Sequence, residues 1–229
     1  MASITPTFSD VPRRISDQVA DTLRREIYSG RLLPGQRLLE IELTERFGIS
    51  RSPFREALLA LQQDRLIELR PHRGAVVVRF TEDDIREICD LRVLLEPRAA
   101  VAAASGTDGS IAQIEEAYQA YVDLAEFGRD ILSAAIAHAD LHRSIANASK
   151  LPRLASFLNM LGTQWLAVTA IAAIQKKATY DLDLHANVVE AIKVRRPKRA
   201  EQAMRAHFKP IDSAIEAYRL LLERADEEA

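Results

Sequence analysis

The chain has 229 residues, of which 48% are hydrophobic and 28% charged, which fits a folded protein of one or two domains and excludes a wholly disordered chain. The net charge of −2 is uneven, because residues 1–80 hold 13 arginines, no lysine and 10 acidic residues, while residues 81–229 carry a net charge of −5. A single cysteine, Cys89, excludes an intrachain disulfide, and the sequence has neither a secretion signal nor the roughly 20 unbroken apolar residues of a membrane helix, so we expect a cytoplasmic protein without membrane contact.

Residues 1–80 are predicted to form short elements separated by turn residues. Apolar side chains recur at every fourth position from Ile15 onward, which predicts a helix that closes at Gly30. A second helix is predicted over residues 40–47, because Gly48 then breaks the apolar pattern.

A third helix is predicted to begin after Ser50, whose hydroxyl can cap it, and to run to about Asp64. The segment that follows predicts two strands around a turn containing Pro71 and Gly74. Two short helices joined by a tight turn and followed by a β-hairpin make a winged helix-turn-helix, to which we assign residues 1–80.

The third helix carries residue types suited to reading DNA. Arg51 and Arg55 are four residues apart, so they share one face near the start of the helix, where guanidinium groups can reach guanine edges in the major groove. Each arginine alone can equally be a surface residue paired with Glu56 or another acid. The combination with a basic hairpin tip favours DNA. The residues assigned to DNA contact are Ser50, Arg51, Ser52, Arg55, His72, Arg73 and Gly74.

The stretch IYSGRLLPGQRLLEIELTERFGISRSPFREALLALQQDRLIELRPHRGAVV resembles the winged-helix domain of the GntR family. It matches the family pattern PG..L.E..L...FG.SR.P.REAL nearly throughout, although Asp64-Arg65 stands where the family often has a glycine near the helix end. The resemblance implies a transcriptional regulator, most often a repressor. Because a palindromic operator presents two half-sites, we expect a homodimer bound to double-stranded DNA.

From residue 81 onward only helices are predicted. Thr81 and Asp84 form a variant of the capping box at the start of the first helix, and Pro97 and Pro210 lie inside predicted helices, where we expect kinks. The fold class is therefore mainly α, with residues 81–229 forming an antiparallel all-α bundle of about six helices. These helices are predicted at about 82–104, 110–127, 131–147, 151–176, 181–195 and 198–224.

Four of the five histidines lie in this second half, on helix faces that are otherwise apolar. His138 and His142 are four residues apart on one helix, and His185 and His207 lie on two later helices. A lone histidine on such a face is more often a hydrogen-bonded core residue than a ligand. Four unpaired imidazoles would be costly to bury, whereas a shared divalent transition metal, with zinc or nickel favoured, would satisfy them together.

Three segments resemble the FCD ligand-binding domain of the FadR-type branch of the GntR family, namely DIREICDLRVLLEPRAA, HADLHRSIANAS and LHANVVEAIKVRRPKRAEQAMRAHF. Metal-binding members of that branch use an Asp-x-x-x-His pair on one helix and two histidines on the last two helices. The resemblance implies that His142, His185 and His207 bind a metal ion. His138 occupies the usual aspartate position, which is a departure from the family pattern.

The same resemblance implies a small organic acid as effector. Arg92 falls on an inward stripe of the first bundle helix, and in the family an arginine at this position faces the ligand cavity and holds a carboxylate. The alternative is an ion pair with Glu96, one turn further on. Asn147, which we also assign to effector binding, and Trp165 can line the same cavity.

We therefore predict a regulator without enzymatic activity, whose operator affinity changes when a small carboxylate binds at a metal site rich in histidine. The alternative is a metal-dependent hydrolase that uses the same histidines. It is disfavoured because Ala139 follows His138, at the position where the metalloprotease motif has a glutamate.

Overall fold

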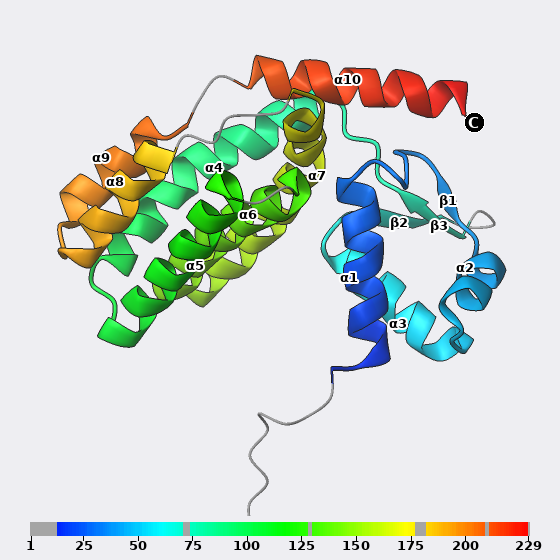
Figure 1. The fold of residues 1–229 in the computed structure, drawn as a ribbon, viewed down its shortest axis with the longest axis horizontal. Helices are drawn as coiled ribbons and strands as arrows, with labels where there is room; N and C mark the ends of the chain where they lie inside the picture. Colours follow the sequence, from blue (N-terminus) through cyan, green and yellow to red (C-terminus); the bar gives the residue numbers. More distant parts are fainter. Residues whose placement is uncertain (1–12, 71–73, 128–129, 177–181, 209–210, 229) are drawn as a thin grey trace, which may run out of the picture.

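A computed structural model of the chain places the winged helix-turn-helix at one end of a helical bundle (Figure 1). The mainly α fold class with these two parts is confirmed. The structure describes residues 13–70, 74–127, 130–176, 182–208 and 211–228.

The winged part contains three helices and a small antiparallel sheet with the strand order β1-β3-β2. The sequence predicts only two of these strands, because β1 has two residues and is too short to show alternation. β1 pairs with β3 through Arg37 opposite Val76. The elements are α1 (Ile15–Tyr28), β1 (Arg37–Leu38), α2 (Glu40–Phe47), α3 (Arg51–Gln63), β2 (Ile67–Arg70) and β3 (Gly74–Val77).

The two ends of the helix-turn-helix are closed by left-handed residues. Gly48 follows α2 with φ of 64°, as the sequence predicts. Arg65 follows α3 with φ of 55°, in the region where the family often has glycine, and it is tied by hydrogen bonds from Arg65 N–H to Gln62 O and from Leu66 N–H to Leu61 O. Ser50 is the residue before α3, but its hydroxyl makes no capping hydrogen bond, so that part of the prediction is wrong.

Seven helices form the second part of the described chain. The capping box at its start is confirmed, because the Thr81 hydroxyl accepts from Asp84 N–H and the Asp84 carboxylate accepts from Thr81 N–H. Pro97 lies inside a helix that continues to Ala103. The helices are α4 (Glu82–Ala103), α5 (Asp108–Glu126), α6 (Ile131–Ala148), α7 (Pro152–Lys176), α8 (Leu182–Lys193), α9 (Pro197–Ala206) and α10 (Asp212–Glu227).

The single last helix predicted over residues 198–224 is wrong. α9 ends at Ala206, and α10 begins at Asp212 and runs in a different direction, across α7 and towards the sheet (Figure 1). Pro210, at which we expect a kink, lies outside the described residues. Because proline has no N–H to donate to the carbonyl four residues earlier, Pro210 removes one helical hydrogen bond and favours a break in this stretch.

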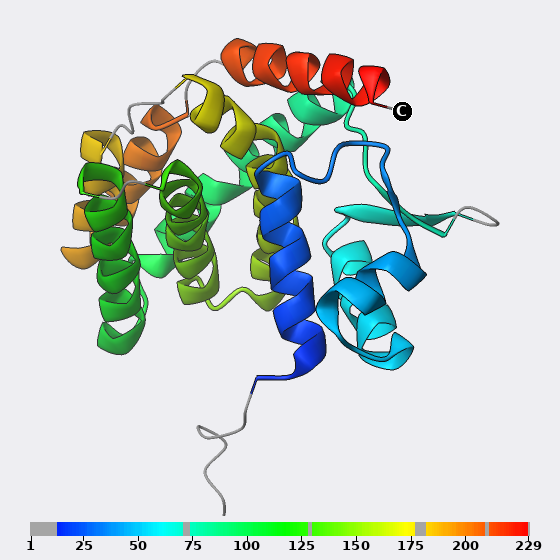
Figure 2. The same cartoon turned by 45° about the vertical axis from the view of Figure 1, so that its right-hand side comes forward.

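The winged part and the bundle share one apolar core. α1 stands beside α7 (Figure 2), and buried side chains of both parts belong to one cluster that includes Leu23, Phe54, Ile171 and Tyr218. The Phe80 N–H donates to the buried Tyr218 hydroxyl on α10 at 3.2 Å. A displacement of α7 or α10 would therefore be transmitted to the helices of the winged part.

α7 is the one described helix that is long and apolar enough to cross a membrane, over Pro152–Ile174. Half of its most apolar window is buried among the other helices of the bundle. This burial is what a core helix of a bundle requires, so α7 gives little support for a membrane contact.

Candidate functional site

Arg51 and Arg55 lie on the exposed face of α3, and both pair with Glu40 at the start of α2. Arg55 Nη2 lies 3.1 Å from Glu40 Oε1, and Arg51 Nε lies 3.7 Å from the same oxygen. The arginine side chains stay 69% and 65% exposed, so these ion pairs are weak and can be exchanged for contacts with DNA. The sequence leaves the partner open as Glu56 or another acid, and in the structure it is Glu40, which belongs to another helix.

The other residues assigned to DNA contact surround this face. Ser50 and Ser52 are exposed at the start of α3, and Gly74 opens β3 with φ of 71°. His72 and Arg73 lie outside the described residues. Phe54 is fully buried on the opposite face of α3, which anchors the helix so that its arginines face outward.

Four histidines from three elements converge in the bundle. His138 and His142 lie on α6, His185 lies on α8, and His207 follows the last residue of α9. The Nε2 atoms of His138 and His185 are 2.8 Å apart, and those of His142 and His138 are 3.2 Å apart. The His207 ring centroid lies 4.8 Å from that of His142 and 5.1 Å from that of His185.

The second nitrogen of two of these rings is held by a partner outside the cluster. His207 Nδ1 lies 2.7 Å from the Met204 carbonyl oxygen, so it carries a proton and leaves Nε2 unprotonated in the neutral ring. His142 Nδ1 lies 2.8 Å from Glu96 Oε2, although their relative direction is not that of a well-aligned hydrogen bond and both atoms are buried. Carboxylates and carbonyls in these positions are the usual outer partners of histidines that bind metal.

The cluster favours neutral imidazoles. Burial and the neighbouring imidazoles, His142 first, lower the pKa of His138, and burial together with His142 lowers the pKa of His207 to about 3. Burial alone would raise the pKa of Glu96, but Arg92 and His142 outweigh it and hold this carboxyl well below its usual range. A neutral imidazole has the lone pair that a metal ion needs.

The residues present fit a divalent metal ion. Only one proton can lie between two imidazole nitrogens, so protons cannot satisfy all three converging Nε2 atoms, whereas one cation can. Nitrogens bound to one tetrahedral zinc ion lie about 3.3 Å apart, close to the observed spacings. His138, His142 and His185 form one group able to hold an ion, and Glu96, His142 and His207 form a second group around the shared His142.

Arg92 makes the ion pair with Glu96 and also lines the cavity. Its Nε donates to Glu96 Oε1 at 2.6 Å, and both side chains are buried. Its guanidinium lies over the rings of Trp165 and Phe208, with centroid distances of 5.1 Å and 5.7 Å. Glu96 thus joins Arg92 to His142, a connection between α4 and α6 that sequence spacing does not reveal.

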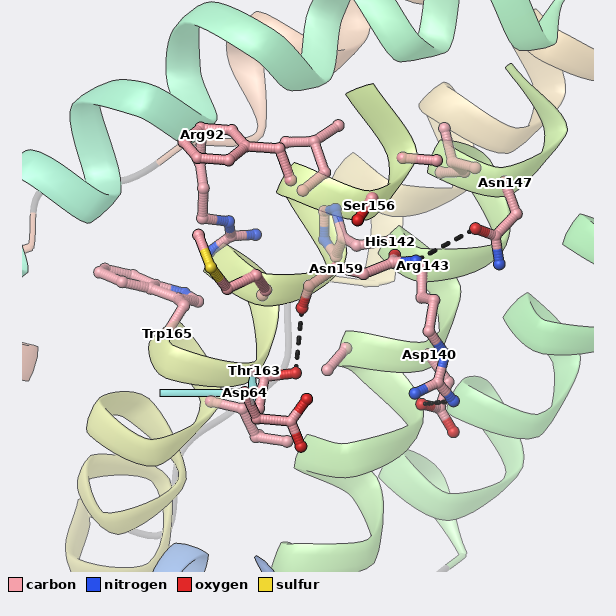
Figure 3. A pocket seen from close by; sticks show the side chains of 18 of the residues that line it. Asp64, Arg92, Asp140, His142, Arg143, Asn147, Ser156, Asn159, Thr163 and Trp165 are labelled. Carbon is pink, nitrogen blue, oxygen red and sulfur yellow. Dashed lines mark hydrogen bonds and ion pairs between the residues drawn. The ribbon is translucent and has the colours of Figure 1, made fainter. Parts of the chain in front are cut away.

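A cavity of about 1520 Å³ opens beside the cluster and extends to the winged part. Figure 3 shows Arg92, His142 and Trp165 on one side and Asp64, the residue that ends α3, on another. Asn147 is exposed at the cavity lining and accepts a hydrogen bond from Asn159 Nδ2 at 3.2 Å. The cavity is therefore lined by α6, which carries His138 and His142, by α7, and by residues of the winged part.

The buried imidazoles predict a pH dependence of stability in the metal-free protein. His207 takes up a proton near pH 6.5 when unfolded but only near pH 3 when folded, so its stabilisation is complete above pH 6.5 and is lost as the pH falls towards 3. Between pH 7.5 and 5.5 this residue alone costs about 1.4 kcal/mol of unfolding free energy, and His138 acts in the same direction. Urea unfolding after chelation measures the loss. The same free energy at both pH values would contradict burial of neutral rings.

Two family models match the chain. The model described as bacterial regulatory proteins of the gntR family matches residues 15–77, and the FCD domain model matches residues 87–210. The first covers α1 to β3, and the second covers the helices that carry the histidines and Arg92.

Relatives of known name align with most of the chain. A "Probable D-xylose utilization operon transcriptional repressor" of Paenarthrobacter nicotinovorans is 30% identical over 84% of this chain and 85% of the relative. A "Gluconate operon transcriptional repressor" of Bacillus licheniformis is 30% identical over 87% of this chain and 84% of the relative. The solved structure of E. coli McbR/YncC has a TM-score of 0.69 at 20% identity and covers 93% of this chain and 100% of that chain, which supports the fold.

Proposed function

The chain belongs to the GntR family of bacterial transcriptional regulators, with a C-terminal FCD domain, and we propose that it is a cytoplasmic repressor that releases its operator when a small carboxylate binds at the histidine cluster. The hydrolase alternative is withdrawn, because the family and the relatives are DNA-binding regulators and not enzymes.

The winged part would read a palindromic operator as half of a homodimer. Arg51 and Arg55 project from the first turns of α3, the end of a recognition helix that meets base edges in the major groove. Ser50 and Ser52 are exposed at the start of α3 and would donate to phosphate, and we propose that His72, Arg73 and Gly74 would also contact the DNA. Two copies related by a two-fold axis would present two such helices to the two half-sites.

The four histidines would hold a divalent ion, zinc or nickel being the best suited. When bound, the ion supplies a Lewis-acid contact and positive charge for a carboxylate. Glu96 would orient His142, and Arg92 would present its remaining N–H donors to the effector next to Asn147. The charged residues around the rest of the cavity are mostly cationic and would attract an anion, with Arg13, Arg24, Arg25, Arg143, Lys150 and Arg153 against Asp21, Asp64 and Asp140.

The route from effector to operator would pass through α6 and α1. α6 carries His138 and His142, and near its start Ser133 accepts a hydrogen bond from Arg25 of α1 at 3.0 Å. An effector that moves α6 or α7 would shift α1 and change the spacing of the two recognition helices in a dimer. The single observation that carries this proposal is the continuity of one cavity from the histidines to Asp64 of the winged part.

Titrating a panel of small carboxylic acids into the complex of the purified dimer with its own promoter DNA tests the proposal. We expect two chains per operator and at least one acid that weakens operator binding by about 5- to 150-fold, the usual range of allosteric coupling. Fluorescence anisotropy of labelled DNA measures the release, and light scattering measures the stoichiometry. A complex that ignores every carboxylate would contradict acid sensing.

A further inference from the structure

The carboxylate of Glu40 lies next to both arginines that are assigned to base reading. Resting on the proposed function, in which α3 is the recognition helix, we infer that Glu40 is a positioning residue for sequence recognition. It holds one edge of the Arg55 guanidinium group and thereby directs the opposite edge towards a guanine in the major groove. The pair would persist when DNA binds, and it would raise the preference for the operator over other sequences.

Glu40 is fixed in place by the start of α2. It is the first residue of that helix, where the partial positive charge of the helix N-terminus stabilises a carboxylate. The Thr44 hydroxyl, one turn further on, donates to the Glu40 carbonyl oxygen at 2.7 Å. The Glu40 side chain is only 30% exposed, so its carboxylate lies deeper in the protein than the two guanidinium groups with which it pairs.

The contact between Glu40 and Arg55 occupies one edge of the guanidinium group. Arg55 Nε donates to Glu40 Oε2 at 3.2 Å, and Arg55 Nη2 lies 3.1 Å from Glu40 Oε1. The carboxylate therefore meets the edge formed by Nε and Nη2. The other edge, formed by Nη1 and Nη2, carries N–H groups that donate to no described residue.

The free edge of Arg55 matches the acceptors of guanine. Guanine presents O6 and N7 side by side in the major groove, and two parallel N–H groups of an arginine can donate to both. Because arginine has five N–H donors, Arg55 can hold Glu40 with one edge and a guanine with the other. Although an exposed ion pair is weak enough to break, reading a guanine does not require this pair to break.

The second carboxylate oxygen explains why both arginines stay near Glu40. Glu40 Oε1 is buried and accepts no hydrogen bond of good geometry from a described residue, although Arg51 Nε lies 3.7 Å away. A buried charged oxygen is costly without positive charge beside it, so Glu40 favours side-chain positions that keep the guanidinium groups close. Arginine otherwise loses much rotamer freedom when DNA fixes it, and holding Arg55 beforehand lowers that loss.

A carboxylate on a face that reads DNA would be unfavourable if it had no other effect. It repels phosphates, so it lowers the affinity for every duplex irrespective of sequence. An arginine released from Glu40 could turn to a phosphate, a contact that carries no sequence information. By restraining Arg55, Glu40 disfavours this alternative, and specificity is gained by weakening the wrong complexes as well as by strengthening the right one.

Anisotropy titrations of the full-length protein with its own promoter DNA and with a scrambled duplex test the inference. For Glu40→Ala we expect the ratio of operator affinity to scrambled affinity to fall by about tenfold or more, while the scrambled duplex binds as tightly as before or more tightly. Glu40→Gln, which keeps one carbonyl oxygen, should lose less. The matched control is Glu42→Ala, because Glu42 is an exposed acid of the same helical turn that forms no ion pair with a described residue.

Replacing each operator guanine in turn with 7-deazaguanine, which lacks the N7 acceptor but still pairs with cytosine, locates the base. One guanine in each half-site should cost the wild type about tenfold in affinity, and Arg55→Ala and Glu40→Ala should lose most of that sensitivity. If the Glu40 variants fold poorly, Arg55→Lys serves instead. A single ammonium group cannot hold a carboxylate and two guanine acceptors in this way, so this variant should lose the same sensitivity and still bind the scrambled duplex.

Three results would overturn the inference and leave the recognition helix intact. They are an equal loss for both duplexes in Glu40→Ala, an unchanged affinity ratio in that variant, and wild-type sensitivity to 7-deazaguanine in Arg55→Lys. The first would give Glu40 a merely structural role. If Arg55→Ala itself binds the operator as the wild type does, the proposed role of α3 fails together with the inference.

Discussion

Replacing Arg51 and Arg55 together with alanine is expected to abolish specific operator binding, and each single substitution should weaken it by about tenfold or more. A bidentate contact between arginine and a base is worth about 1–3 kcal/mol, and two such contacts are lost in each half of a dimer. Folding should change little, because both guanidinium groups are mostly exposed and their pairs with Glu40 are weak.

Anisotropy titrations at one fixed salt concentration, with the operator and with a scrambled duplex, measure this loss. Arg205→Ala is the matched control, because Arg205 is an exposed arginine on α9 that pairs with Glu201 of its own helix. If the two arginines contact only phosphate, both duplexes should lose affinity equally and the salt dependence should become shallower. If the double variant binds the operator as tightly as the wild type, α3 is not the recognition helix.

The DNA-reading face could be predicted because it depends on local rules. The alternation of buried Phe54 with exposed Arg51 and Arg55 follows from the helical period, and Gly48 ends α2 in the left-handed conformation that glycine favours. The sequence does not reveal which acidic residue forms ion pairs with these arginines. Glu40 is 11 and 15 residues away, and only the angle between α2 and α3 brings it close.

The convergence of His138, His142 and His185 could also be predicted from helical phase, since each lies on an apolar stripe that must face the bundle, whereas His207 follows the end of α9. The partner that orients His142 could not, because Glu96 reaches it from α4 through tertiary packing, whereas the Met204 carbonyl lies only three residues before His207 at the end of α9. The prediction of one last helix over residues 198–224 is wrong, although Pro210 in the middle of that stretch favours a break. The sequence predicts one helix with a kink at Pro210, whereas one helix ends at Ala206 and another begins at Asp212.

If the cluster holds the proposed metal ion, removing one imidazole is expected to abolish its binding. His185→Ala and His138→Ala should each weaken metal affinity by more than 100-fold, because loss of an outer partner alone typically costs 10- to 100-fold and these residues offer converging Nε2 atoms. Elemental analysis after dialysis, and the thermal unfolding shift on adding zinc or nickel, report the loss. A bound ion at 100-fold excess over its dissociation constant stabilises by about 2.7 kcal/mol, which these variants should lack.

His138→Asp tests whether metal binding needs a ligand atom at position 138 or the imidazole ring itself. Aspartate supplies an oxygen that can bind a divalent metal ion, so this variant should retain the ion while His138→Ala does not. His72→Gln changes the one histidine outside the cluster and should keep full metal content. Because the DNA-reading face is built by other residues, every cluster variant that folds should still bind the operator but should no longer release it on addition of acid. Wild-type metal content in both His185→Ala and His138→Ala would show that neither ring is needed to bind the ion, which would contradict the proposed site.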